Sequence, residues 1–325
     1  MNPCRRLVLC AIALSAVAPR VEGARPKRVV LFIGSTTQFA EQARRQIIDH
    51  LGAEGFVAGR DVEVELVVAE RWSEVAKAAD RIVASRPDVI ATGGTDLTKL
   101  IQERTRDIPV VFRNVADPVG AGLVQSLPRP GGNITGESNQ SYALEGKRYE
   151  ILRELRPRLR RVLVVSVGGI ASDLAGKEQR VQAQRLGITL DELIVARDRV
   201  EAEFARILPR IVATRPDAVV FQAFDPRLAQ EQRLLKELEA RAIPAMFLDN
   251  RVVQAGGLIS LGIRNDVIDP TPVRIMARVL RGESPATIPV AQMTRTHLAL
   301  NLRTARAMKL EVPESVRLRA DEVID

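Results

Sequence analysis

Short apolar runs alternate with longer amphipathic stretches along most of the chain. Runs such as 29–33 and 89–92 are rich in β-branched residues and lack polar alternation, which is typical of parallel strands covered on both faces. The stretches between them repeat their apolar positions with helical spacing. This alternation predicts an α/β protein whose parallel sheets are doubly wound.

The expected elements fall into two similar series. In the first half we expect strands at 29–33, 62–68, 89–92 and 110–113, and helices at 38–51, 74–85 and 96–104. In the second half we expect strands at 162–166, 190–195, 218–221 and 245–248, and helices at 176–186, 199–213 and 228–241. After these, a strand at 258–262, a helix at 271–281 and a strand at 296–302 should carry the chain back to the first half and out again.

The two halves also share sequence. RIVASRPDVI at 81–90 matches RIVATRPDAV at 210–219 with seven identities in ten positions. RVVLFIG at 28–34 and RVLVVSV at 161–167 precede this pair, and IPVVF at 108–112 and IPAMF at 243–247 follow it. Three matches in the same order predict a duplicated unit and therefore two similar lobes. We expect residues 25–137 with about 258–290 to form lobe 1, and residues 138–257 with about 291–325 to form lobe 2.

The first 24 residues have the layout of a secretory signal peptide. Arg5 and Arg6 precede an apolar run at 7–18, and small residues follow at Gly23 and Ala24. The run is shorter than the roughly 20 residues of a spanning helix. We expect 1–24 to direct export to the periplasm. A lipid anchor at Cys10 is the alternative, although bulky Leu9 precedes that residue.

Composition narrows the class of protein. Both cysteines, Cys4 and Cys10, lie in the signal segment, so the exported chain would have no thiol and no disulfide. The net charge is +8, but aromatic residues make up only 3%, and the arginines are spread along the chain. We therefore expect no nucleic-acid partner. His50 and His297 lie outside the strand-end loops and no metal-ligand cluster is visible, so we expect neither an enzyme nor a bound metal or cofactor.

Candidate binding residues lie in loops after the expected strands, because the carboxyl ends of parallel strands meet at one crevice. The candidates are Ser35, Thr36, Thr37, Gly94, Thr95, Asn114, Asp117, Ser166, Asp225, Asp249 and Asn250. Hydroxyls and amides in this set could bind a carboxylate, while Asp117, Asp225 or Asp249 could bind an ammonium group. This chemistry favours an amino acid or a similar zwitterion. The alternative for Ser35 and Thr95 is that each only caps a helix.

The stretch DPVGAGLVQSLPRPGGNITG at 117–136 closely resembles a signature of the ABC transporter substrate-binding protein family that includes bacterial aromatic amino-acid binders. LNLRTARA at 300–307 and RADEVI at 319–324 are similar to the closing segments of that family. The resemblance implies the periplasmic binding protein type I fold, in which two Rossmann-like lobes are joined by a hinge and close on a small ligand. It also implies an inner-membrane ABC permease as partner, and we expect a monomer.

The sequence departs from the family where aromatic rings are common. Val68, Ser166-Val167-Gly168 and Leu261-Gly262 stand where the family often has Trp, Trp-Asn-Pro and Tyr-Gly. The loss of these rings argues against aromatic specificity, although Trp72 could partly compensate. A sensory module that reports ligand occupancy to a membrane protein is the alternative to an importer subunit.

Overall fold

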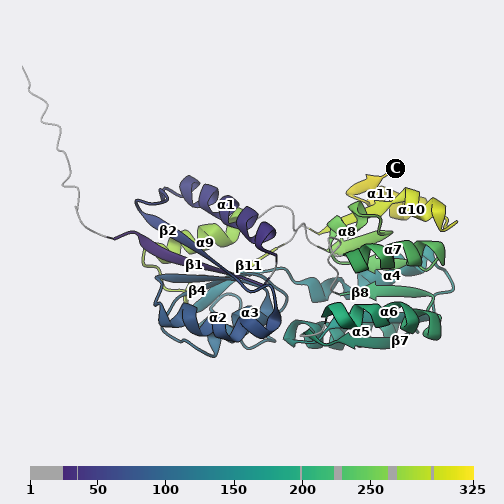
Figure 1. Ribbon diagram of the computed structural model, residues 1–325, viewed down its shortest axis with the longest axis horizontal. Coiled ribbons are helices and arrows are strands. Elements are labelled where there is room, and N and C mark those ends of the chain that lie inside the picture. The colour runs from purple at the N-terminus through teal and green to yellow at the C-terminus, as the bar shows by residue number, and fades with distance from the viewer. Residues whose placement is uncertain (1–24, 35, 198–199, 223–228, 263–268, 294–295) are drawn as a thin grey trace, which may run out of the picture.

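The computed structural model describes residues 25–34, 36–197, 200–222, 229–262, 269–293 and 296–325. Two lobes lie side by side, and each is a sheet flanked by helices (Figure 1). The strand order is β11-β5-β4-β3-β1-β2 in the first sheet and β13-β12-β10-β9-β8-β6-β7 in the second. The pairs within both sheets are parallel except for β10 with β12. The predicted α/β fold with two parallel-dominated, Rossmann-like sheets is confirmed.

The elements follow the chain in two series. The first lobe contains β1 (Lys27–Ile33), α1 (Thr37–Ala53), β2 (Val62–Val68), α2 (Trp72–Ala84), β3 (Val89–Gly93), α3 (Thr95–Gln102), β4 (Val110–Val115), β5 (Ile134–Ser138), α9 (Pro270–Leu280) and β11 (Ala291–Gln292). The second lobe contains η1 (Ser141–Leu144), α4 (Glu145–Leu155), β6 (Arg161–Val167), α5 (Ile170–Arg185), β7 (Thr189–Val195), α6 (Val200–Thr214), β8 (Ala218–Phe221), α7 (Ala229–Ala240), β9 (Ala245–Phe247), α8 (Asn250–Gln254), β10 (Ile259–Gly262), β12 (His297–Asn301), α10 (Leu302–Ala307), α11 (Glu314–Arg319) and β13 (Glu322–Ile324).

Strand β1 shows why the apolar runs are continuous. Val29 and Leu31 pack into a cluster with α1 and α9 on one face of the sheet. Val30 and Phe32, which point the other way, pack into a second cluster with α2 and α3. All four side chains are buried. Because alternate residues of a strand point to opposite faces, a sheet covered on both sides needs apolar residues at every position.

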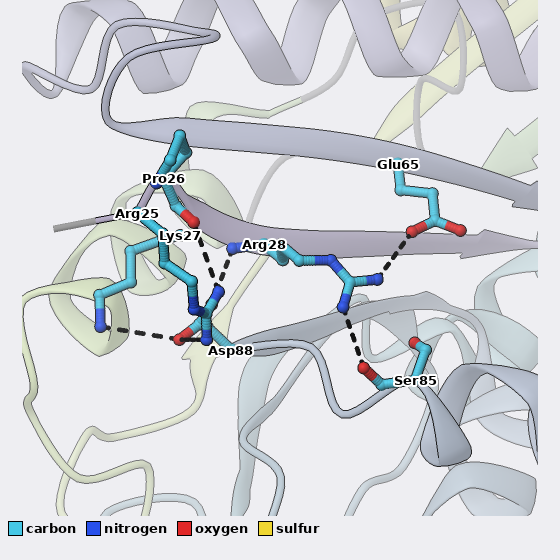
Figure 2. Close-up of polar contacts among 7 residues, drawn as sticks. All are labelled: Arg25, Pro26, Lys27, Arg28, Glu65, Ser85 and Asp88. Atoms are coloured by element: carbon cyan, nitrogen blue, oxygen red, sulfur yellow. Dashed lines mark hydrogen bonds and ion pairs between the residues drawn. The ribbon is translucent and has the colours of Figure 1, made fainter. Parts of the chain in front are cut away.

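The repeated Arg-Pro-Asp motif has the same structural role in both lobes. The Asp88 carboxylate accepts the backbone N–H of Arg28 at 2.8 Å, which fixes the start of β1 (Figure 2). In the second lobe Asp217 accepts the backbone N–H of Arg161, at the start of β6, also at 2.8 Å. The arginine before each proline has a positive φ, 45° at Arg86 and 47° at Arg215. The duplication seen in sequence is thus a duplicated turn that ties the third strand of each lobe to the first.

The chain crosses between the lobes after β5, β10 and β11. The predicted assignment of 258–290 to lobe 1 needs correction at its start, because β10 pairs with β9 and β12 in the second sheet. The assignment of 291–325 to lobe 2 needs the opposite correction, because β11 pairs with β5 in the first sheet. Local hydrophobicity predicted the strand at 258–262 but not the two-residue strand β11, and it carried no information on which sheet each segment would join.

Replacing Asp88 by Ala is predicted to lower the free energy of unfolding by about 2 kcal/mol, because the partly buried N–H of Arg28 would lose a charged acceptor. Glu65→Ala is the matched control, since Glu65 also contacts Arg28, through an exposed ion pair of 3.2 Å (Figure 2). That exposed pair should contribute less than about 1 kcal/mol. Urea denaturation measures both losses, and equal losses would contradict the role given to Asp88.

Candidate functional site

A cleft with a volume of about 500 Å³ opens between the two lobes. Strand ends and helix starts of the first lobe form one wall, and those of the second lobe form the other. The first lobe contributes Leu31, Ile33, Gly34, Phe39, Gly93, Gly94, Arg113 and Asn114. The hinge and the second lobe contribute Asn139, Ser141, Arg148, Phe221, Gln222, Leu248, Asp249, Arg251, Val252 and Gly262. A cleft of this size accommodates a small organic ligand.

Arg113, near the carboxyl end of β4, lines this cleft. Its guanidinium forms no hydrogen bond or ion pair within the part of the chain that the structure describes. Burial lowers the pKa of Arg113, and the carboxylates of Glu137 and Asp269 oppose that effect through their charge. The N–H groups of this side chain are therefore available to an acceptor in the cleft.

Arg148, on the first helix after the hinge, lines the cleft from the second lobe. Its side chain is fully buried; Nε donates to the carbonyl of Leu261 at 2.9 Å, and Nη1 donates to Glu145 at 2.5 Å and to the carbonyl of Ser141 at 3.4 Å. Its Nη2 is buried and has no hydrogen-bond partner. A buried guanidinium nitrogen without an acceptor is costly, by roughly 1–3 kcal/mol or more, unless a ligand supplies one.

Glu145 holds Arg148 in place. Its two carboxylate oxygens accept hydrogen bonds from Gln179 at 3.0 Å and from Gln222 at 3.2 Å, in addition to the bond from Arg148. Glu145 is buried, and Gln222 lies at the end of β8 in the wall of the cleft. The position of the Arg148 guanidinium is therefore fixed by contacts to α5, β8 and β10 before any ligand binds.

A third arginine spans the cleft. Arg251 lies in the first turn of α8 and forms an ion pair with Asp249, the N-cap residue of that helix. Its guanidinium also lies over the ring of Phe39 in the first lobe, 5.4 Å from the ring centroid. This cation–π contact joins the two walls directly.

A second contact between the lobes lies at the facing ends of α3 and α5. Asp96 of the first lobe accepts the backbone N–H of Ile170 at 2.8 Å and forms an ion pair of 2.8 Å with Arg197. The Arg197 guanidinium also lies 4.2 Å from the centroid of the Trp72 ring. We call Asp96, Ile170, Arg197 and Trp72 the interlobe bridge. Both charged side chains are mostly buried there, so the bridge stabilises the approach of the lobes.

Three of the predicted site residues, Gly94, Asn114 and Asp249, line the cleft. Gly94 has a φ of 85° and donates its N–H to the Arg113 carbonyl at 2.9 Å, so that backbone without a side chain faces the cleft. Asn114 has a φ of 62° and accepts a hydrogen bond from Asn139 at 2.7 Å. These two residues shape the first wall.

Six other predicted residues lie in local contacts instead. Thr36 caps α1, and Thr37 donates to Glu70 at 2.6 Å. Thr95 is buried at the start of α3, and Asp117 accepts the N–H of Gly120 at 2.7 Å in a turn. Ser166 lines a separate hollow beside α5, and the buried Asn250 donates to Glu322 at 3.3 Å. Ser35 and Asp225 lie outside the described residues.

Sequence reasoning missed the cleft arginines. Arg113 is the last residue of the strand predicted at 110–113, and the residues before it in IPVVFRN are apolar. A charged residue at the carboxyl end of a parallel strand indicates a position in the crevice. Arg148 lies inside a polar helical stretch, where an arginine is most often solvated. Arg251 directly follows the candidates Asp249 and Asn250 in the sequence. Within the described ranges, no group of three His, Cys, Asp or Glu side chains could hold a metal ion. Those ranges also contain no helix that is long and apolar enough to cross a membrane.

Two α/β lobes with a cleft between them define the periplasmic binding protein type I architecture. The chain belongs to the ABC transporter substrate binding protein family, whose model matches residues 35–324. A curated tyrosine-binding protein of Clostridioides difficile is 23% identical over 87% of this chain and 79% of its own length.

Two solved structures share the fold with a TM-score of 0.79 and 24% identity. One is an ABC domain from Streptococcus pneumonia in complex with L-Trp, and the match covers 93% of this chain and all of that one. The other is a conserved domain protein from Vibrio cholerae, and the match covers 92% of this chain and all of that one. Both likenesses support the fold assignment.

Replacing Asp96 by Ala is predicted to shift the protein toward a more open arrangement, because the interlobe bridge loses its acceptor. The loss of one partly buried charged contact should change the ratio of open to closed forms by about tenfold. Trp72 is the only tryptophan in the sequence, so its fluorescence reports this change directly.

Asp80→Ala is the matched control, because Asp80 forms a 2.6 Å ion pair with Arg104 inside the first lobe. We expect a red shift of Trp72 emission and a larger radius of gyration in Asp96→Ala alone. Unchanged fluorescence and size in both variants would show that the bridge does not hold the lobes together.

Glu137 makes the stability of the first lobe depend on pH. It is a buried β5 residue whose pKa is raised to about 7 by burial and by the charge of Asp269, while Arg113 lowers it. Because the folded state binds this proton more tightly than the unfolded state, stability should fall as pH rises from about 4.5 to about 7. A shift of this size corresponds to roughly 3 kcal/mol.

Glu137→Gln should remove this dependence. The variant is predicted to gain stability relative to the unmodified protein as the pH is raised from 5 to 8, and urea denaturation at both pH values measures the difference. A difference between the two proteins that is the same at pH 5 and at pH 8 would contradict the raised pKa.

Proposed function

We propose that the protein is the periplasmic solute-binding subunit of an ABC importer. It captures a small polar solute, an amino acid or a related compound, between its two lobes and presents the closed form to an inner-membrane permease. The observation that carries this proposal is the cleft of about 500 Å³ whose walls come from both lobes. A ligand that contacts both walls favours the closed form by its differential affinity.

Three further observations support the proposal. The family to which the chain belongs is one of ABC transporter substrate binding proteins. One relative is named for binding tyrosine, and one solved structure holds L-Trp. The expected signal peptide at 1–24 is consistent with export. We propose that the protein acts as a monomer, without nucleic acid and without enzymatic turnover.

The aromatic specificity of those two proteins is not part of the proposal. The cleft contains the rings of Phe39 and Phe221, but Arg251 already covers Phe39, and Phe221 stacks on Phe247 with centroids 5.2 Å apart. Val68 packs in the first-lobe core. The rings present are thus engaged by the protein itself, which leaves the side-chain class of the solute open.

The exported form, residues 25–325, should bind a small solute and close on it. We predict that one or more members of a panel of amino acids and small carboxylates raise the melting temperature by several degrees, since saturation at 100 times Kd adds about 2.7 kcal/mol. The same ligand should change Trp72 fluorescence and reduce the radius of gyration. Binding without any change in size or fluorescence would contradict capture by lobe closure, and so would slow chemical conversion of the ligand.

A further inference from the structure

We infer that the solute is held through a carboxylate that Arg113 of the first lobe and Arg148 of the second lobe bind together. This inference rests on the proposed function and names its substrate class: small organic anions rather than neutral sugars and polyols. The two arginines line the same cleft from opposite walls, and each has donors that the protein does not use.

Arg148 provides the fixed half of the site. Three hydrogen bonds to Leu261, Ser141 and Glu145 engage Nε and Nη1, and the whole side chain is buried. Only Nη2 is left without an acceptor. A buried charged donor gains most from an ionised acceptor, because charge-assisted hydrogen bonds are roughly twice as strong as neutral ones.

Arg113 provides the second half. Its charge is stabilised at a distance by Glu137 and Asp269, but none of its N–H groups is hydrogen-bonded within the described ranges. The planar guanidinium matches a carboxylate in two parallel hydrogen bonds. A neutral hydroxyl would leave most of these donors without acceptors.

The remaining charges of the cleft agree with an anionic ligand. Among the described residues that line it, Arg113, Arg148 and Arg251 are cationic, and Asp249 is the one acidic residue. Asp249 is already paired with Arg251. Since the two unsatisfied arginines belong to different lobes, a carboxylate between them would favour closure, which a contact to one lobe alone would not.

This placement differs from the sequence expectation that hydroxyl groups bind the carboxylate. Thr37 donates its hydroxyl to Glu70, and Thr36 accepts the N–H of Phe39 as a helix cap. Neither lines the cleft. Arg113 and Arg148, by contrast, both line the cleft and have donors that the described residues do not use.

The experiment uses residues 25–325 and a panel of L-amino acids, mono- and dicarboxylates, and neutral sugars and polyols. Thermal shift finds ligands, and calorimetry then compares each carboxylate with the amide in which –CONH₂ replaces –COO⁻. We expect every ligand found to carry a carboxylate and the amide to bind at least about 100-fold more weakly, the size expected for losing a buried charged contact of about 3 kcal/mol.

Two variants locate the carboxylate. Arg113→Gln should weaken binding at least tenfold without lowering the melting temperature of the ligand-free protein, because Arg113 makes no hydrogen bond to any described residue. Arg148→Lys keeps the positive charge but removes Nη2, the donor without an acceptor. This variant should also weaken binding at least tenfold. Arg158→Gln, at an exposed site on the far side of the second lobe from the cleft, should change neither property.

The outcomes separate this inference from the proposed function. A neutral sugar or polyol that binds and closes the lobes would overturn the carboxylate site and leave the importer subunit in place. An amide that binds as well as its carboxylate, or full affinity in Arg113→Gln, would also overturn it. If no member of the panel binds, both the inference and the proposed function are contradicted.

Discussion

The buried ion pair between Glu145 and Arg148 joins the parts of the second lobe that meet the hinge and the cleft. Arg148 contacts β10 through Leu261 and the 3₁₀ turn through Ser141, while Glu145 contacts α5 and the end of β8. The 3₁₀ turn lies where the chain enters the second lobe, and β10 is the last strand before the chain returns to the first lobe. The geometry of the hinge and the geometry of the cleft therefore depend on the same two side chains.

Such a pair is expensive to bury, because both ions lose their hydration and the attraction between them repays that cost only with additional hydrogen bonds. Glu145 has these bonds, whereas Arg148 retains one unsatisfied nitrogen. The cost that remains in the ligand-free protein is removed when an acceptor arrives. Ligand binding and the closed form of the cleft are then coupled through one preorganised donor, with Arg113 acting from the other lobe.

Much of the fold could be predicted from the sequence because the strands obey a simple rule. A strand covered on both faces must be apolar throughout, and β1, β3, β4, β6, β8 and β9 were predicted on that basis. Strand β5 could not be predicted in this way, because its sequence ITGES contains polar residues that are nevertheless buried. Gly136 allows it to approach β4 so closely that a Cβ atom would lie 2.0 Å from the Phe112 carbonyl oxygen. The need for a glycine at position 136 is therefore explained by its contact with β4, which the sequence alone does not reveal.

Part of the lining of the cleft could be predicted from the sequence, whereas its arginines could not. The rule that loops at carboxyl strand ends converge placed Gly94, Asn114 and Asp249 at the cleft. The rule cannot tell which hydroxyls are already used as helix caps, and Thr36 is used in that way. Helix α4 was not predicted, because the polar Glu145 and Arg148 are buried on the same helix as its apolar Ile151, Leu152 and Leu155 and obscure the apolar face in the sequence. In the sequence, a Glu and an Arg three positions apart look the same whether they form a buried ion pair or lie on a solvated helix face.

The central claim is that a ligand joins the lobes through Arg113 and Arg148. A crystal structure of residues 25–325 with a ligand found by thermal shift tests it most directly. We expect an oxygen of the ligand within hydrogen-bond distance of Nη2 of Arg148 and a second oxygen bound by the guanidinium of Arg113. A ligand seated in the cleft that leaves both groups without acceptors would contradict the account.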